Sequence, residues 1–98
     1  MPLHRYVATV LDSGPMADLI LESVQVYLAS NRRVQAAADA LLIHGNTLRY
    51  RLDKYASLTG ADLSNTEVII EVWWALEYWQ VRRDRIGQAG GHDRDPGP

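Results

Sequence analysis

Residues 36–52 read AAADALLIHGNTLRYRL, and the pattern of this stretch decides the fold. Its first half is rich in alanine, a strong helix former whose small side chain lets a neighbouring helix approach closely. Residues 42–44 break the pattern, and beyond them apolar side chains again recur at helical spacing. The sequence therefore predicts two helices, over residues 34–41 and about 45–57, joined by a short turn.

Two helices joined by so short a turn have the spacing of a helix-turn-helix, whose second helix enters the major groove of DNA by its N-terminal end. Ala38 is small at the point where the two helices would cross. The side chains expected to fix the crossing by burial are Leu41, Ile43, Leu48 and Leu52. An ordinary helical hairpin in a small bundle has the same spacing, so spacing alone does not decide between the two interpretations.

Under the DNA-binding interpretation, polar side chains in the first turns of the second helix reach bases and phosphates. Asn bonds adenine in a bidentate manner, Arg bonds guanine, and Thr or Tyr bonds a phosphate. His44 has two candidate roles, a phosphate contact and a cap that accepts a backbone N–H, and the cap is favoured. The candidate DNA-binding residues are Arg32, Arg33, His44, Gly45, Asn46, Thr47, Arg49, Tyr50 and Arg51.

Helical spacing continues outside this pair. Apolar residues from 3 to 11 predict a short first helix, and an apolar stripe predicts a second helix over 15–29. Residues 64–67 read SNTE, which matches a capping box with the Ser64 hydroxyl as the cap, and predict a last helix from about 65 to 84. Because no stretch has the period-two alternation of a strand, we expect an all-α domain of four to five helices.

The expected organisation of the chain has three parts. These are a short helix and turn over 1–14, a helix-turn-helix DNA-binding domain over 15–84 and a disordered tail over 85–98. The 98 residues, 47% hydrophobic and 22% charged, suit a single globular domain.

Composition also narrows the function classes. The absence of Cys excludes disulfides and thiolate metal sites, and His4, His44 and His92 are too far apart for a short metal motif. No nucleophile–base pair or phosphate loop is visible, so we expect no metal, no cofactor and no enzymatic activity. No apolar run is long enough for a membrane span and no targeting segment is visible, so the expected location is the cytoplasm.

The net charge of the chain is −2, but its middle section is basic. Residues 31–54 carry five cations against two acidic residues. DNA affinity follows local cationic patches rather than net charge, so double-stranded DNA is an allowed partner. Ordinary solvated helix faces would also explain these cations, and charge by itself favours that explanation.

A resemblance to a known family favours DNA binding over ordinary solvated helix faces. The run AAADALLIHGNTLRYRL resembles the C-terminal DNA-binding domain of PucR/CdaR-type bacterial transcriptional regulators, whose core reads approximately A-A-x-x-L-x-[VI]-H-R-N-T-L-R-Y-R-L. Residues 58–63 and 21–31 resemble the flanking segments of that family, so the resemblance covers roughly residues 15–80. It implies a Fis-like helix-turn-helix that acts in transcription regulation and normally follows a larger sensory region.

One departure from the family pattern bears on function. Gly45 stands where the family usually has Arg, which removes a DNA-contacting side chain and implies weaker binding or an altered sequence preference. The alternative function is therefore a helical interaction or dimerisation module that has lost DNA binding.

The last helix is unusually aromatic. Ile69, Val72, Leu76 and Trp79 form one apolar stripe, and a second stripe is expected roughly 100° away around the helix axis. A broad stripe buried in the core is one interpretation. The favoured one is a surface for a partner, either a second copy in a homodimer or a sensory domain absent from this chain. The candidate interface residues are Ile70, Trp73, Trp74, Tyr78 and Val81.

Overall fold

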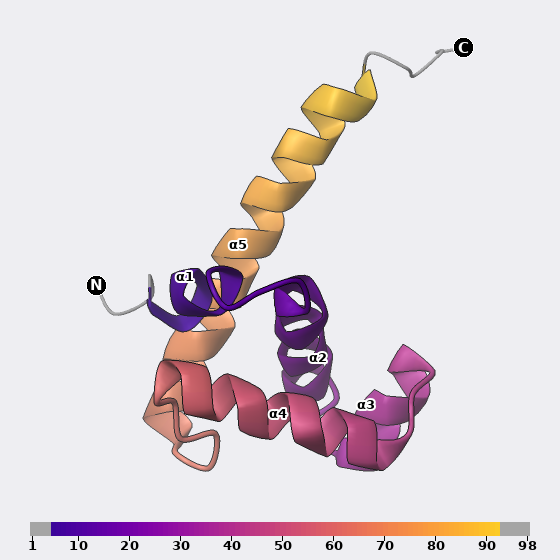
Figure 1. Cartoon of the computed structure of the whole chain (residues 1–98), viewed down its shortest axis with the longest axis vertical. Coiled ribbons are helices and arrows are strands. Elements are labelled where there is room, and N and C mark those ends of the chain that lie inside the picture. Colours follow the sequence, from indigo (N-terminus) through magenta and orange to yellow (C-terminus); the bar gives the residue numbers. More distant parts are fainter. Residues whose placement is uncertain (1–4, 93–98) are drawn as a thin grey trace.

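The computed structural model describes the backbone of residues 5–92 and the side chains of residues 5–81. All regular structure in this part of the chain is helical, which confirms the predicted all-α class (Figure 1). The helices, in chain order, are α1 (Arg5–Leu11), α2 (Ala17–Ala29), α3 (Val34–Leu41), α4 (Gly45–Thr59) and α5 (Thr66–His92).

Helix α4 lies along one side of the molecule (Figure 1), and α2 is the element that contacts all four other helices. Helices α1 and α2 both contact α4, and α3 fits against α2 and α4 at the end where α4 begins. Helix α5 packs its first half against α1 and α2, and its second half extends beyond the body, away from α3 and α4. The start of α4 is therefore left at the surface.

The core draws on all five helices. Its largest fully buried side chains include Tyr6 from α1, Leu21 from α2, Leu48 and Tyr55 from α4, and Leu76 from α5. Alanine supplies the contribution of α3, in which Ala37 and Ala38 are fully buried. Small side chains at these two positions allow α3 to approach its neighbours closely.

Two tyrosines connect three helices inside this core. The Tyr55 hydroxyl donates a hydrogen bond to the Tyr6 carbonyl oxygen at 2.9 Å, and the Tyr6 hydroxyl donates to Glu71 Oε1 at 2.9 Å. Burial, with a smaller contribution from nearby Tyr6, raises the pKa of the Tyr55 phenol well above its ordinary value. The phenol therefore keeps its proton and remains a donor, so α4 is tied to α1 and α1 to α5.

The turn between α3 and α4 depends on a left-handed residue. Helix α3 spans the predicted residues and is followed by its C-cap residue, Leu42, whose φ is 58°. This conformation lets the backbone N–H of Ile43 donate to the Ala38 carbonyl oxygen at 3.0 Å and reverses the chain direction. The Leu42 side chain is 91% exposed, so it makes few packing contacts that could offset the strain of its left-handed backbone.

Replacement of Leu42 by glycine is expected to stabilise the domain. Relief of the left-handed strain is worth about 1–2 kcal/mol, and the greater freedom of glycine in the unfolded chain offsets about 0.5–1 kcal/mol of it. The expected net gain in free energy of unfolding is therefore up to about 1 kcal/mol, measurable by urea denaturation. Leu42→Ala, which keeps the strain, serves as the control, and a Leu42→Gly protein less stable than Leu42→Ala would contradict the explanation.

The start of α5 differs from the predicted capping box. Asn65 caps the helix, because its Oδ1 accepts from the backbone N–H groups of Glu67 at 2.9 Å and Val68 at 3.2 Å. The Ser64 hydroxyl instead donates to Asp62 Oδ1 at 2.6 Å, and this bond, with one from the Ser64 backbone, lowers the pKa of Asp62. The prediction of Ser64 as the cap was thus wrong by one residue, since Asp62 already engages its hydroxyl.

The end of α5 also differs from the prediction. The helix continues to His92 instead of stopping near residue 84, so residues 85–92 of the predicted tail are helical. Glycines in this segment lower helix propensity by about 1 kcal/mol each but do not terminate a helix, and the next proline is Pro96. The remainder of the predicted tail, 93–98, lies outside the described residues.

Candidate nucleic-acid interface

The crossing of α3 and α4 is built as the sequence predicts. Leu48 is fully buried and Leu52 nearly so, and both belong to the same core cluster as Ala38. Leu41 and Ile43 are half-buried and pack against the same cluster. Apolar packing on one side of α4 leaves its opposite side, beginning at Gly45, for polar residues.

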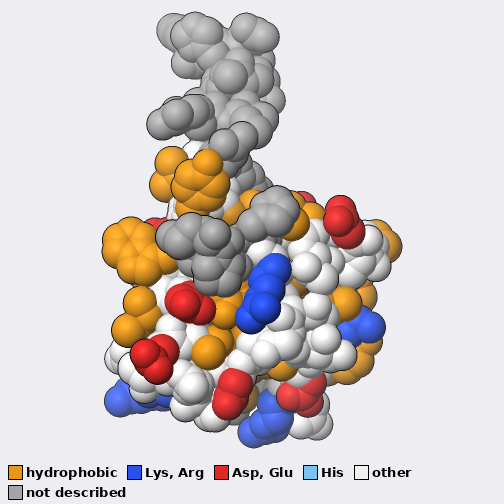
Figure 2. All heavy atoms as spheres, turned by 90° about the vertical axis from the view of Figure 1, so that its left-hand side faces the viewer, with side chains coloured by type: hydrophobic (Ala, Val, Ile, Leu, Met, Phe, Trp, Pro, Cys, Tyr) orange, Lys and Arg blue, Asp and Glu red, His pale blue; other side chains and the backbone are white. Residues whose placement is uncertain are grey.

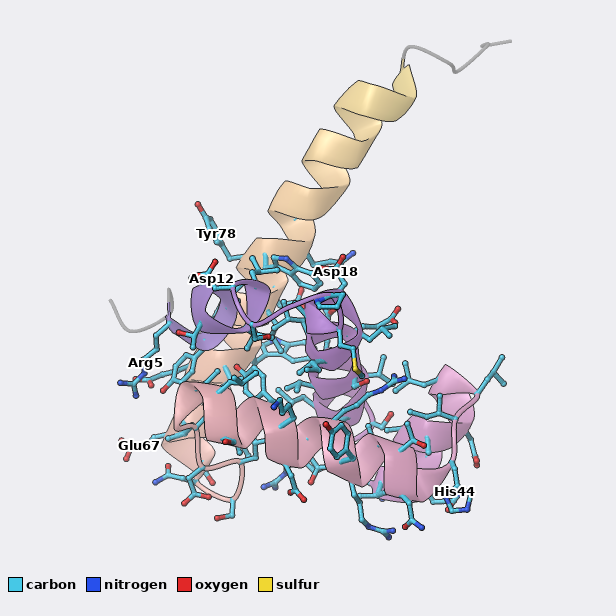
Figure 3. All side chains as sticks on the ribbon, in the orientation of Figure 1. Arg5, Asp12, Asp18, His44, Glu67 and Tyr78 are labelled. Carbon is cyan, nitrogen blue, oxygen red and sulfur yellow. The ribbon has the colours of Figure 1, made fainter. Side chains whose placement is uncertain are left out.

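His44 caps α4. Its Nδ1 accepts a hydrogen bond from the backbone N–H of Asn46 at 3.0 Å, as the predicted capping role requires. The ring lies at the exposed start of α4 (Figure 3). Because the cap occupies Nδ1 as an acceptor, only Nε2 remains to donate to a phosphate.

Asn46 and Arg49 form an exposed pair one turn apart on α4. Arg49 Nη1 donates to Asn46 Oδ1 at 3.1 Å, and this hydrogen bond holds the two polar side chains beside each other. Thr47 and Tyr50 are exposed in the same two turns, with Tyr50 58% exposed. The structure therefore brings four of the predicted contact residues together on the open side of α4.

Two further cations stand ahead of α3. Arg32 and Arg33 are exposed, in a turn where Asn31 and Arg32 both have left-handed backbones with φ of 58° and 61°. This turn carries the chain from the end of α2 into α3, whose N-terminus faces the start of α4. Arg32 and Arg33 thus add positive charge beside α3, apart from the four exposed contact residues of α4.

Arg51 departs from its predicted role as a phosphate contact. Its side chain is half-buried, and its Nη1 donates to Ser23 Oγ of α2 at 3.2 Å. Ser23 is fully buried and its hydroxyl donates to the Leu19 carbonyl oxygen at 2.7 Å. The physical reason is register, since five residues place Arg51 about 140° around the helix from Asn46 and turn it towards α2.

The backbone at Gly45 does not require glycine. Its φ is not positive, and a Cβ added there would meet its nearest neighbours, Arg49 Nη1, Gln35 Oε1 and Val34 Cγ1, at ordinary contact distances of 3.8–3.9 Å. A residue with a Cβ is therefore accommodated at position 45 without displacing these neighbours.

Gln35 borders the start of α4, although it was not among the predicted site residues. It is exposed in the first turn of α3, donates to Asp39 Oδ1 at 2.8 Å and lies beside the space over Gly45. A glutamine in a helix of this kind carries no distinctive sequence signal. Only the crossing of the two helices reveals that it borders the start of α4.

The predicted interface residues of α5 are mostly exposed. Ile70, Trp74, Tyr78 and Val81 are 52%, 62%, 61% and 53% exposed, whereas Trp73 is half-buried. The other stripe faces the core through Val72 and Leu76. At about 100° per residue the two stripes are centred on nearly opposite sides of α5, so the expected separation of roughly 100° was too small.

Two kinds of feature are absent from the part of the chain that the structure describes. No group of three or more His, Asp or Glu side chains there is arranged to hold a metal ion. No helix in the same part of the chain combines the length and the apolar character that crossing a membrane requires.

A capped helix with an exposed polar start, crossing an alanine-rich helix after a tight turn, defines the chain as a helix-turn-helix domain of the DNA-binding class. Residues 20–78 match the family model of the PucR C-terminal helix-turn-helix domain, and the chain belongs to this family. It is thus a DNA-binding domain of the kind found in bacterial transcriptional regulators, as predicted, and nothing supports the alternative of a module without DNA binding.

Three relatives illustrate the range of the family. The transcriptional activator PmfR of Paenarthrobacter nicotinovorans is 34% identical over 83 residues, 85% of this chain and 18% of the relative. The proline-responsive transcriptional activator PutR of Bacillus subtilis is 39% identical over 46 residues, 47% of this chain and 11% of the relative. The carbohydrate diacid regulator of Escherichia coli is 36% identical over 64 residues, 65% of this chain and 17% of the relative.

The chain spans less than a fifth of the length of each of these relatives. No solved structure matches it.

Proposed function

We propose that this domain reads an operator sequence with the first two turns of α4 and so directs a transcriptional regulator to its genes. Asn46 and Arg49 contact base edges in the major groove, and Thr47 and Tyr50 contact phosphates on either side. Arg32 and Arg33 add phosphate contacts from the turn before α3. Arg51 is left out of this set, because its guanidinium reaches Ser23 of α2.

The observation that supports this proposal most strongly is the ordered pair at the start of α4. Asn46 and Arg49 are exposed, joined at 3.1 Å, and placed at the helix end that enters the groove in this class. Their amide and guanidinium groups have the donor and acceptor pattern that discriminates adenine and guanine edges. A pair ordered before binding loses less side-chain freedom when it meets DNA.

Binding can be tested without knowledge of the operator. A pool of random duplexes is passed over the chain, the enriched sequence is labelled, and its fluorescence anisotropy is compared with that of a scrambled duplex at ~50 and ~200 mM salt. We expect tighter binding to the enriched duplex and a steep loss of affinity with salt. Equal affinity for both duplexes, or no binding at the lower salt concentration, would refute the proposal.

Gly45→Arg is expected to strengthen DNA binding. A Cβ at position 45 meets its neighbours at ordinary contact distances, and a guanidinium added at the start of α4 supplies a further phosphate or base contact, so affinity should rise by about tenfold. Gly45→Ala is the matched control, because it improves helix propensity without adding a charge. If both variants raise affinity equally, helix stabilisation rather than the guanidinium is responsible.

For the whole regulator, we propose that a sensory region accompanies this domain and that regulation acts in the cytoplasm, where bacterial DNA lies. The much greater length of the relatives supports an accompanying region. The exposed residues of α5 offer a surface through which such a region, or a second copy, contacts the domain.

A further inference from the structure

The outward face of α5 carries a run of large apolar side chains. Ile70, Trp74, Tyr78 and Val81 are each more than half exposed, and they follow one another at spacings of four, four and three residues. These spacings keep all four on one side of a helix. Figure 2 shows hydrophobic side chains gathered at the left-hand edge of the body and at its top, where α5 leaves it. We call these four residues the α5 stripe.

The α5 stripe is nearly symmetric about its own centre. When two copies of α5 are laid antiparallel with the twofold axis passing residue 76, Trp74 of one copy lies opposite Tyr78 of the other. Ile70 and Val81 then come together within one residue of register at each end. Aromatic pairs of this kind favour close contact beyond the area that they bury.

Charges at the two ends of the stripe follow the same symmetry. Glu67 is exposed one turn before Ile70, and the sequence has an arginine at position 85, four residues after Val81. The antiparallel register about residue 76 places Glu67 opposite position 85 of the other copy, at both ends of the pair. A parallel arrangement would instead bring like charges together.

We propose that the α5 stripe is the surface on which a second copy of this chain docks, as an antiparallel helix pair centred on residue 76. The match of apolar with apolar residues and of acid with base in one register favours a second copy over an unrelated partner. Tyr78 and His44 lie on opposite sides of the molecule (Figure 3). Pairing through α5 therefore leaves the start of α4 open to DNA.

The first test is the mass of the chain in solution, measured by sedimentation equilibrium between ~5 and ~500 μM. We expect a monomer–dimer equilibrium, which Trp74→Lys shifts towards monomer by at least tenfold in dissociation constant. Circular dichroism checks that the variant keeps its helices. Thr9→Lys, an exposed change of equal charge on α1, is the control and leaves the equilibrium unchanged. A chain that remains monomeric up to ~500 μM overturns the proposal.

The second test distinguishes the register from any other contact through the same face. Glu67→Arg and Arg85→Glu each place like charges opposite one another twice in the dimer, and each is expected to raise the dissociation constant about three- to tenfold at low salt. The double variant Glu67→Arg/Arg85→Glu restores the opposite charges and the affinity. Additive losses in the double variant, or no loss in either single one, overturn the antiparallel register. None of these measurements uses DNA, so their outcome is independent of the proposed operator binding.

Discussion

Replacement of Arg49 by alanine is expected to weaken binding to the preferred duplex by about 1–3 kcal/mol, or about 5- to 150-fold. Arg49 is exposed at the start of α4 and is held beside Asn46 by a 3.1 Å hydrogen bond. The substitution removes a guanidinium that can bond guanine in a bidentate manner and also frees the Asn46 amide. Fluorescence anisotropy with the enriched and scrambled duplexes measures the loss, which should be smaller for the scrambled one.

Arg5→Ala is the matched control for this experiment. It removes the same charge from α1, where the guanidinium lies over the Tyr6 ring at 5.3 Å from its centroid. Figure 3 places Arg5 far from the start of α4, so the preferred duplex should be bound as tightly as by the unaltered chain. Equal losses for the two variants would mean that Arg49 acts only through net charge, and an unchanged affinity for Arg49→Ala would remove that residue from the interface.

Replacement of Leu48 by alanine should cost about 2–5 kcal/mol of folding free energy, which is the range for a buried leucine that leaves a cavity. Leu48 is fully buried where α4 crosses α3, and a small domain has only about 5–15 kcal/mol of stability in total. Urea denaturation followed by circular dichroism measures the change in midpoint. DNA binding should weaken with it, because the crossing fixes the direction of α4.

The same chemical truncation at an exposed position isolates the effect of burial. Leu42→Ala removes the same atoms from a side chain that is 91% exposed, and should change the free energy of unfolding by no more than about 0.5 kcal/mol. If Leu48→Ala is as mild as Leu42→Ala, the close packing of α3 on α4 is not what holds the domain together.

The helix pair could be predicted from sequence because its determinants are local. Helix α3 has the predicted bounds, α4 begins at the predicted Gly45, and His44 makes the predicted cap. Each depends on residues within about one turn of the feature, such as an alanine-rich run or an acceptor two positions before a backbone N–H. The family resemblance was confirmed for the same reason, since it rests on this contiguous stretch.

Features that depend on contacts between distant segments were predicted less well. Arg51 was assigned to phosphates because a charged residue on a DNA-binding helix suggests that role, and only the position of Ser23 on α2 redirects it. Gln35 became a neighbour of the interface only through the crossing of α3 and α4. Ser64 and Asn65 could each cap α5, and the capping-box motif does not tell which of the two side chains does so. The bond from Ser64 to Asp62 leaves the cap to Asn65.

The hydrogen bonds donated by the Tyr55 and Tyr6 hydroxyls restrict the rotation of α4 relative to α1 and α5. Rotation of α4 about its axis would break the bond from Tyr55 to the Tyr6 carbonyl oxygen and leave buried polar groups unsatisfied, at a cost of about 1–3 kcal/mol. The bond from Tyr6 to Glu71 extends the same constraint to α5. A body attached to α5 would therefore turn α4 together with α5, because these two bonds join α5 to α1 and α1 to α4.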